Sequence, residues 1–181
     1  MIEIITDRLL LREHRESGLE YFHAWISVPE VMRFVGFPLS GSLAESRQRL
    51  SQIIQAARCQ DRKQYFFAIV TKHNNSYIGD TGLTILNQQQ DSGIAENGYF
   101  LLPTNQKQGY AVEAVKAVLD FGFTELKLHK IIAHCDKRNT SSENVMFRCG
   151  MVNEGDFRLH RFAADGVWTD ELVYAIVKWD R

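Results

Sequence analysis

The chain has 181 residues, of which 45% are hydrophobic and 24% are charged, a composition typical of a soluble globular protein with enough length for one substantial core. The formal net charge is −1, which gives no electrostatic basis for binding nucleic acid or an anionic membrane. No apolar run approaches the length of a membrane span, no signal-peptide layout opens the chain, and the three cysteines lack metal-type spacing. We therefore expect one cytoplasmic domain over residues 1–181 with free thiols and without a metal, membrane or nucleic-acid partner.

The N-terminal residues predict a strand followed by short helices. Residues 6–12 are rich in β-forming side chains around an apolar centre and predict the first strand. Short helices are expected over 17–26 and 29–34, the first capped by Ser17 and the second with Pro29 in its first turn.

The middle of the chain begins with a turn over 36–41 and a longer helix. Ser42 and Glu45 have the spacing of a capping box, which predicts the start of this helix. The polar, glutamine-rich stretch 87–93 is expected to be a loop. The remaining strands are expected in apolar or alternating runs over 65–71, 77–86, 94–102, 130–136, 151–158 and 171–178.

A glycine turn joins the strand over 94–102 to an amphipathic helix with an apolar stripe. Gly109 lies in this turn, next to the helix start, where backbone N–H groups lack intrahelical acceptors and the helix dipole favours an anion. Lys107 adds positive charge. The turn is not a P-loop, and it has one of the three glycines of a dinucleotide fingerprint. A phosphate site and a plain structural turn both fit this stretch taken alone.

Strands cluster first as hairpins and then alternate with helices through residue 136, where a second, shorter helix follows and ends by Gly150. This order predicts a mixed α/β sheet with about seven strands and helices on both faces.

Motifs spread along the chain resemble the GNAT superfamily of acyl-CoA N-acyltransferases, and most closely its ribosomal-protein-type (RimJ/RimL-like) branch. The motifs are Thr6-Asp7-Arg8-Leu9-x-Leu11-Arg12, Glu96 on the strand before the glycine turn, Gln106-x-x-Gly109-x-Ala111, Asn139-x-x-Ser142 with Gly150 after it, and Trp168-x-Asp170-Glu171-Leu172-x-Tyr174. The resemblance implies the GNAT fold and an acetyl-CoA-dependent N-acetyltransferase that acts on a primary amine by direct attack in a ternary complex.

The resemblance also implies which residues bind the cofactor. The strand end is expected to splay from its neighbour through a bulge, so that its backbone groups pair with the pantetheine arm and stabilise the thioester oxyanion. Arg148 is expected near a CoA phosphate, although a solvated helix charge fits it equally well. The cofactor-binding residues are then Leu101, Leu102, Gln106, Lys107, Gln108, Gly109, Tyr110, Ala111, Asn139, Ser142 and Arg148.

Glu96 and Ser142 are the expected catalytic residues. Glu96 is the candidate base that deprotonates the amine, and its alternative is a solvated carboxylate at a strand start. Ser142 is the candidate acid for the departing thiolate, and its alternative is an ordinary first-turn residue of a helix that Asn139 caps. Many relatives use a tyrosine seven residues after the asparagine, where this chain has Met146.

The acceptor amine, a protein N-terminus or a small amine, is not identified by the sequence. The N-terminal helices, with Trp25 as a core residue, are expected to form one wall of the acceptor cleft, and the loop over 160–168 the opposite wall or a homodimer contact. His129 and His134 have opposite strand parity, which excludes a shared metal on a regular strand. The alternatives in function are an acyl-CoA-binding module with little catalysis and, more remotely, a nucleotide-binding oxidoreductase.

Overall fold

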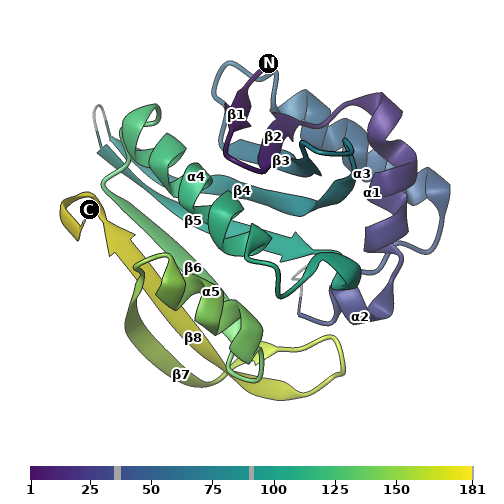
Figure 1. The fold of residues 1–181 in the computed structure, drawn as a ribbon. Coiled ribbons are helices and arrows are strands. Elements are labelled where there is room, and N and C mark those ends of the chain that lie inside the picture. The colour runs from purple at the N-terminus through teal and green to yellow at the C-terminus, as the bar shows by residue number, and fades with distance from the viewer. Residues whose placement is uncertain (35–37, 90–91, 181) are drawn as a thin grey trace.

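A computed structural model describes residues 1–34, 38–89 and 92–180, which form one eight-stranded sheet in the order β1-β2-β3-β4-β5-β6-β8-β7 (Figure 1). The strands are β1 (Glu3–Ile5), β2 (Leu9–Glu13), β3 (Gln64–Thr71), β4 (Tyr77–Gln89), β5 (Ser92–Leu101), β6 (Lys130–Asp136), β7 (Val152–Phe162) and β8 (Trp168–Val177). The helices are α1 (Leu19–Ile26), α2 (Pro29–Met32), α3 (Leu43–Ala56), α4 (Tyr110–Thr124) and α5 (Thr140–Arg148). The mixed α/β architecture expected from the sequence is confirmed, with one strand more than predicted.

The additional strand lies at the N-terminus. The sequence predicts one strand over 6–12, whereas the chain forms the antiparallel pair β1 and β2 with a tight turn between them. Thr6 closes this turn, because its N–H donates to the Leu9 carbonyl at 3.0 Å and its hydroxyl accepts from the Leu9 N–H at 2.9 Å. A hydroxyl that bonds nearby backbone favours a turn over continued strand.

Two predicted loops are largely strand. In the stretch predicted as a loop over 87–93, β4 continues to Gln89 and β5 starts at Ser92, and residues 90–91 lie outside the described ones. Similarly, β7 and β8 extend into the predicted loop 160–168. Backbone pairing with a neighbouring strand overrides the weak β-propensity of polar side chains at these places.

The helix starts follow their capping residues, with one exception. The Ser42 hydroxyl accepts from the Glu45 N–H at 3.2 Å, and the Asn139 side chain accepts from the Ser142 N–H at 3.2 Å. Ser17 is not a cap: it lies within a short 3₁₀ turn, and Gly18 precedes α1. The turn predicted over 36–41 falls partly on residues 35–37, outside the described chain.

Helices cover both faces of the sheet, as predicted. The face under α4 and α5 carries the larger core, with Leu11, Phe67 and Val115 fully buried. The opposite face packs against α1, α2 and α3 through a smaller cluster that includes Trp25 and Leu50. Successive strand residues divide between the two cores, as side-chain alternation requires. No helix in the described part of the chain is long and apolar enough to cross a bilayer.

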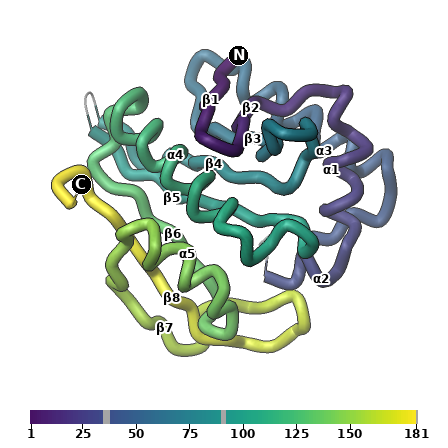
Figure 2. Tube along the Cα trace, in the orientation of Figure 1, coloured from purple at the N-terminus to yellow at the C-terminus, as the bar shows by residue number. Residues whose placement is uncertain are grey.

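The topology brings two helix starts to one edge of the sheet. β5 and β6 are parallel neighbours, so their carboxyl ends reach the same edge. α4 follows β5 and α5 follows β6, and the trace in Figure 2 shows both connections leaving from this side. The segments 106–111 and 139–142, where cofactor-binding residues are expected, therefore lie together at the carboxyl ends of these two strands.

Candidate active site

β5 and β6 pair over three residues only and then separate. Their register ends at Glu96 opposite Ile132, and β6 continues beyond that point paired only with β8 (Figure 2). The rest of β5 therefore has no partner on its β6 side in the described structure. This is the splay that the resemblance implies. The irregularity in register lies in β4, between Ile85 and Asn87, and not in β5 as expected.

The free backbone N–H groups on β5 beyond the splay belong to Tyr99 and Leu101. The Leu102 N–H donates to the Ile78 carbonyl of β4 at 2.8 Å. Because alternate residues of an antiparallel strand direct their backbone groups to opposite sides, Tyr99 and Leu101 direct theirs toward β6. The N–H of Leu102 is thus not available to a thioester oxygen, which corrects the sequence-based expectation for that residue.

The turn before α4 presents a row of unpaired N–H groups. Lys107 and Gly109 have positive φ angles of 60° and 83°, and the first N–H bonded within the helix is that of Glu113, which donates to the Gly109 carbonyl at 3.1 Å. From Lys107 to Val112, no backbone N–H has an acceptor among the described residues. Such a concave run of N–H groups at a helix start binds anions.

Gln106 and Arg8 brace this turn from two sides. Gln106 Nε2 donates to the Leu101 carbonyl at 3.1 Å, which ties the turn to the strand end. Arg8 Nη1 donates to the Gln108 carbonyl at 3.0 Å, its guanidinium lies 4.5 Å from the centre of the Tyr110 ring, and its Nε bonds a carboxylate oxygen of Glu113 at 2.6 Å.

Glu113 completes the brace. Thr6 Oγ1 donates to the other carboxylate oxygen at 2.6 Å. Burial alone would raise the pKa of Glu113, but the hydrogen bonds from Thr6 and Arg8 and the Arg8 charge outweigh it and lower the pKa. The N-terminal motif around Arg8 thus positions the anion site, a role that sequence reasoning missed because the partners lie about 100 residues apart along the chain.

Ser142 lies at the start of α5 and is paired with Tyr99. The hydroxyl oxygens of the two side chains are 2.8 Å apart, and the Tyr99 hydroxyl also lies 2.8 Å from the Ser142 carbonyl. Burial raises the pKa of Tyr99 well above its ordinary value, although the bond to Ser142 works against this, so the phenol keeps its proton. Met146, where many relatives carry tyrosine, is fully buried in the core. In this chain the phenol that contacts Ser142 therefore belongs to Tyr99 on β5, and not to a tyrosine at position 146 on α5.

Asp136 shapes the turn that presents Asn139. It is 1% exposed, and its carboxylate accepts hydrogen bonds from the backbone and guanidinium of Arg138 and from Thr169 Oγ1. Burial by itself would raise the pKa, but these bonds and the Arg138 charge prevail and lower the pKa of Asp136 to about 2.

This shift predicts how stability depends on pH. A carboxylate whose folded pKa lies below its ordinary 3.8 stabilises the fold above that value, and loses its contribution as the pH falls toward about 2. Asp136→Asn should therefore unfold at lower urea concentration than wild type at about pH 7, and the difference should narrow below about pH 4. An undiminished difference at about pH 3 would show that the charge of Asp136 is not what stabilises the turn.

Glu96 is half-buried on the face opposite α4. Its backbone pairs with Thr84 and Ile132, and alternation places its side chain on the face of Phe100, whose ring packs 3.7 Å from that of Trp25. Within the described residues the Glu96 carboxylate has no hydrogen bond or ion pair. It is therefore free to bind a ligand at the point where β5 and β6 separate. Trp25 is 3% exposed, which confirms its prediction as a core residue.

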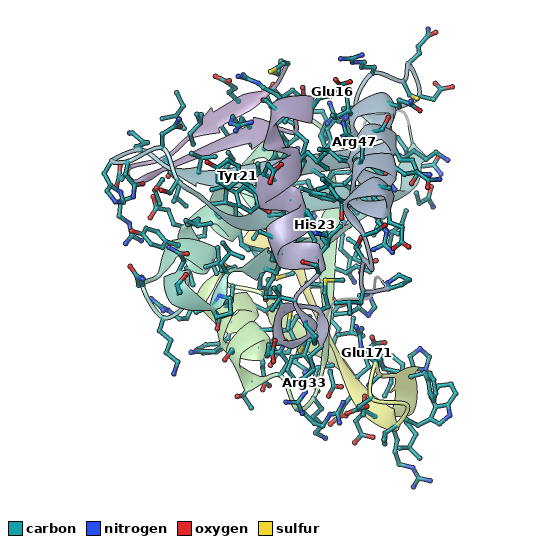
Figure 3. The ribbon with its side chains drawn as sticks, turned by 90° about the vertical axis from the view of Figure 1, so that its right-hand side faces the viewer. Glu16, Tyr21, His23, Arg33, Arg47 and Glu171 are labelled. Carbon is teal, nitrogen blue, oxygen red and sulfur yellow. The ribbon has the colours of Figure 1, made fainter. Side chains whose placement is uncertain are left out.

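The same face is closed at one end by α2 and the β7–β8 hairpin. Arg161 of β7 donates to the Phe34 carbonyl after α2 at 3.1 Å and to Glu171 of β8 at 3.2 Å. Figure 3 shows Arg33, which follows α2, and Glu171 of β8 toward the same end of this face. The segments predicted to form opposite walls of the acceptor cleft are therefore in contact.

Arg148 and Cys149 lie at the end of α5. Arg148 is exposed at the last residue of α5. The next residue, Cys149, contacts the Val112 carbonyl in the first turn of α4 at 3.7 Å, which brings the end of α5 close to the anion site. Cys59, Cys135 and Cys149 are all free thiols, as predicted.

Comparison with known proteins shows the family to which the chain belongs. Residues 8–152 match the acetyltransferase (GNAT) domain family. The chain is 30% identical over 173 residues to the uncharacterized N-acetyltransferase YoaA of Bacillus subtilis, covering 96% of this chain and 95% of that one.

Two solved structures share the fold. They are the ribosomal-protein-S5-alanine acetyltransferase of Vibrio fischeri (TM-score 0.84, 20% identity, 98% of this chain and 97% of that one) and the spermidine N-acetyltransferase of Vibrio cholerae in complex with CoA and spermine (TM-score 0.83, 24% identity, 97% and 98%). The chain belongs to the GNAT family of acetyl-CoA-dependent N-acetyltransferases.

Proposed function

We propose that this chain binds acetyl-CoA in the splay between β5 and β6 and transfers the acetyl group to a primary amine that enters from the face of α1 and α2. The observation that supports this most strongly is the coincidence of unpaired β5 backbone with unpaired N–H groups at the start of α4. One flexible ligand with a polar arm and a pyrophosphate satisfies both. CoA has this chemistry.

The places of the unpaired backbone N–H groups suggest which residues bind each part of CoA. The N–H groups from Lys107 to Ala111 bind the pyrophosphate, and the N–H groups of Tyr99 and Leu101 bind the pantetheine arm and the thioester oxygen. Asn139 holds the α5 start with its side-chain oxygen, which leaves its amide NH₂ for the arm.

The chemistry needs no covalent enzyme intermediate, because a thioester is already activated. The protein supplies a neutral amine, an aligned carbonyl and a proton for the departing sulfur. Glu96 takes a proton from the amine, and Ser142, backed by the Tyr99 phenol, is the acid for the thiolate. Since a buried phenol stays protonated, the Ser142–Tyr99 pair can pass a proton at neutral pH.

The acceptor class remains wide within this proposal. The two solved relatives act on a ribosomal-protein alanine and on spermidine, although the fold is common to both. We propose a protein N-terminus or a small amine as acceptor, in a single cytoplasmic domain over 1–181. The homodimer predicted from the sequence stays a prediction, which sedimentation velocity tests directly.

Arg148 provides a test of the phosphate side of the site. Arg148→Ala should raise the KM for acetyl-CoA by a few-fold and leave kcat nearly unchanged, because one exposed charge near a phosphate contributes up to about 1 kcal/mol. Arg158→Ala, an exposed arginine on β7, is the matched control. If the two variants have the same KM as wild type, Arg148 is a solvated surface charge.

Thermal unfolding with added nucleotides tests the ligand. CoA at 100 times its dissociation constant should stabilise the fold by about 2.7 kcal/mol, and NAD at the same concentration should not. Stabilisation by NAD without stabilisation by CoA would overturn the proposal in favour of a nucleotide-binding oxidoreductase.

A further inference from the structure

His134 lies on β6, the strand next to β5, which carries Glu96. It is on the face of the sheet from which we propose that the amine enters. It follows Ile132 by two residues on β6, and Ile132 is the residue paired with Glu96. Side chains of paired and alternate residues share a face, so Glu96, Ile132 and His134 all face the acceptor side. Because the strands separate just beyond Ile132, His134 lies next to the place where thioester and amine must meet.

A chain of polar contacts holds His134 in place. Its Nδ1 lies 3.6 Å from Oε2 of Glu171, a separation for an ion pair and not for a direct hydrogen bond. The other oxygen of Glu171 accepts from Arg161 at 3.2 Å, and Arg161 is anchored on the Phe34 carbonyl. The His134–Glu171 pair is therefore linked through Arg161 to the segment that follows α2, on the expected wall of the acceptor cleft.

The exposure of the two side chains suits a group that exchanges protons. Glu171 is 12% exposed, and His134 is 28% exposed. The carboxylate is thus sheltered enough to act on its neighbour, while the imidazole still reaches water. With Nδ1 directed at Glu171, Nε2 remains for another partner.

We infer that His134, positioned by Glu171, accepts a proton from the acceptor amine during acetyl transfer, an inference that rests on the proposed function. An alkylammonium must lose two protons to become an amide. The nitrogen forms its bond to the acetyl carbon, the carbon–sulfur bond breaks with its electron pair on sulfur, one proton ends on that sulfur, and the other goes to solvent. Glu96 and His134 flank the nitrogen and take these protons in turn. His134 hands its proton to water, the Ser142–Tyr99 pair protonates the sulfur, and the proton taken by Glu96 returns through solvent to restore that pair.

The electrostatic surroundings fit this role. The charged and titratable groups facing His134 are Glu96 from β5, Glu171 from β8, and His160 and Arg161 from β7. Asp136, further along β6, is already held by Arg138 and Thr169. Glu171 therefore places its carboxylate beside the His134 imidazole, while Arg161 orients that carboxylate.

The test compares kcat for wild type, His134→Gln and Glu171→Gln with the best amine acceptor, from about pH 7 to about pH 9, where an α-amine becomes neutral. His134→Gln should lower kcat about tenfold or more at the lower pH, and the deficit should shrink as the pH rises. Glu171→Gln should give a smaller deficit of the same pH dependence. The dissociation constant for CoA should not change in either variant.

Two controls separate proton transfer from a structural role. His129→Gln, an exposed histidine just before β6, should leave the rates unchanged. Imidazole added to His134→Ala should restore part of the lost rate, which a packing defect would not allow. A wild-type rate and pH profile in His134→Gln, or a deficit that is equal at every pH and insensitive to imidazole, would overturn this inference alone. A wild-type chain that binds CoA but acetylates no amine would overturn the proposed function, and this inference with it.

Discussion

Glu96→Gln is expected to lower kcat at neutral pH by about 10²–10⁴-fold, the usual contribution of general-base catalysis. A primary amine is mostly protonated at this pH, and glutamine keeps the shape of the side chain while removing its ability to take a proton. CoA binding should persist, because Glu96 faces the acceptor side of the sheet and not the α4 side. The deficit should shrink at high pH, where more of the amine is already neutral. Steady-state kinetics across pH, together with CoA titration, measure both effects.

The matched control is Glu125→Gln, an exposed carboxylate at the end of α4, which should behave like wild type. Near-normal kcat in Glu96→Gln across the whole pH range would remove Glu96 from the mechanism. Loss of CoA binding in that variant would instead show that Glu96 supports the cofactor site.

Gly109→Asp is expected to raise the dissociation constant of CoA by about 100-fold, equivalent to about 2.7 kcal/mol. The substitution places a carboxylate among the N–H groups assigned to the pyrophosphate, so two like charges meet a few ångströms apart. A Cβ at this position would also lie 3.4 Å from Arg8 Nη2, so the new carboxylate would disturb the side chain that braces this turn. Isothermal titration with CoA measures the change.

Backbone strain must be separated from charge in this experiment. Gly109 has a φ of 83°, which a side chain adopts with difficulty, so some loss of stability is expected from any substitution. Gly109→Ala carries the same strain without the charge, and Gly166→Asp adds a carboxylate at a φ of 78° in open space. Both should bind CoA far better than Gly109→Asp. Equal binding by Gly109→Asp and Gly109→Ala would place the pyrophosphate elsewhere.

Features determined by neighbouring residues were predictable from the sequence. The caps at Ser42 and Asn139 lie where predicted, since a side-chain oxygen bonds N–H groups only a few residues away. Gly109 has the positive φ that the turn requires. Alternating and helical apolar patterns also predicted most strands and both helical layers.

Features determined by distant residues were not predictable. No local pattern shows that Leu102 gives its N–H to Ile78, or that Tyr99 reaches Ser142 across the splay. The His134–Glu171 pair likewise exists only because β6 and β8 are adjacent. In each case the pairing depends on strand order and register, which a single sequence does not specify. The sequence therefore predicted the cofactor turn better than the acid–base groups around it.

Acetyl-CoA turnover against a panel of amines and N-terminal peptides tests the central claim most directly, if released thiol and acetylated amine are measured in the same reaction. Direct transfer predicts that thiol is released only when an acceptor is present, and that one acetylated amine forms for each thiol. CoA binding with no amine-dependent thiol release, across the whole panel, would contradict catalysis and leave an acyl-CoA-binding module.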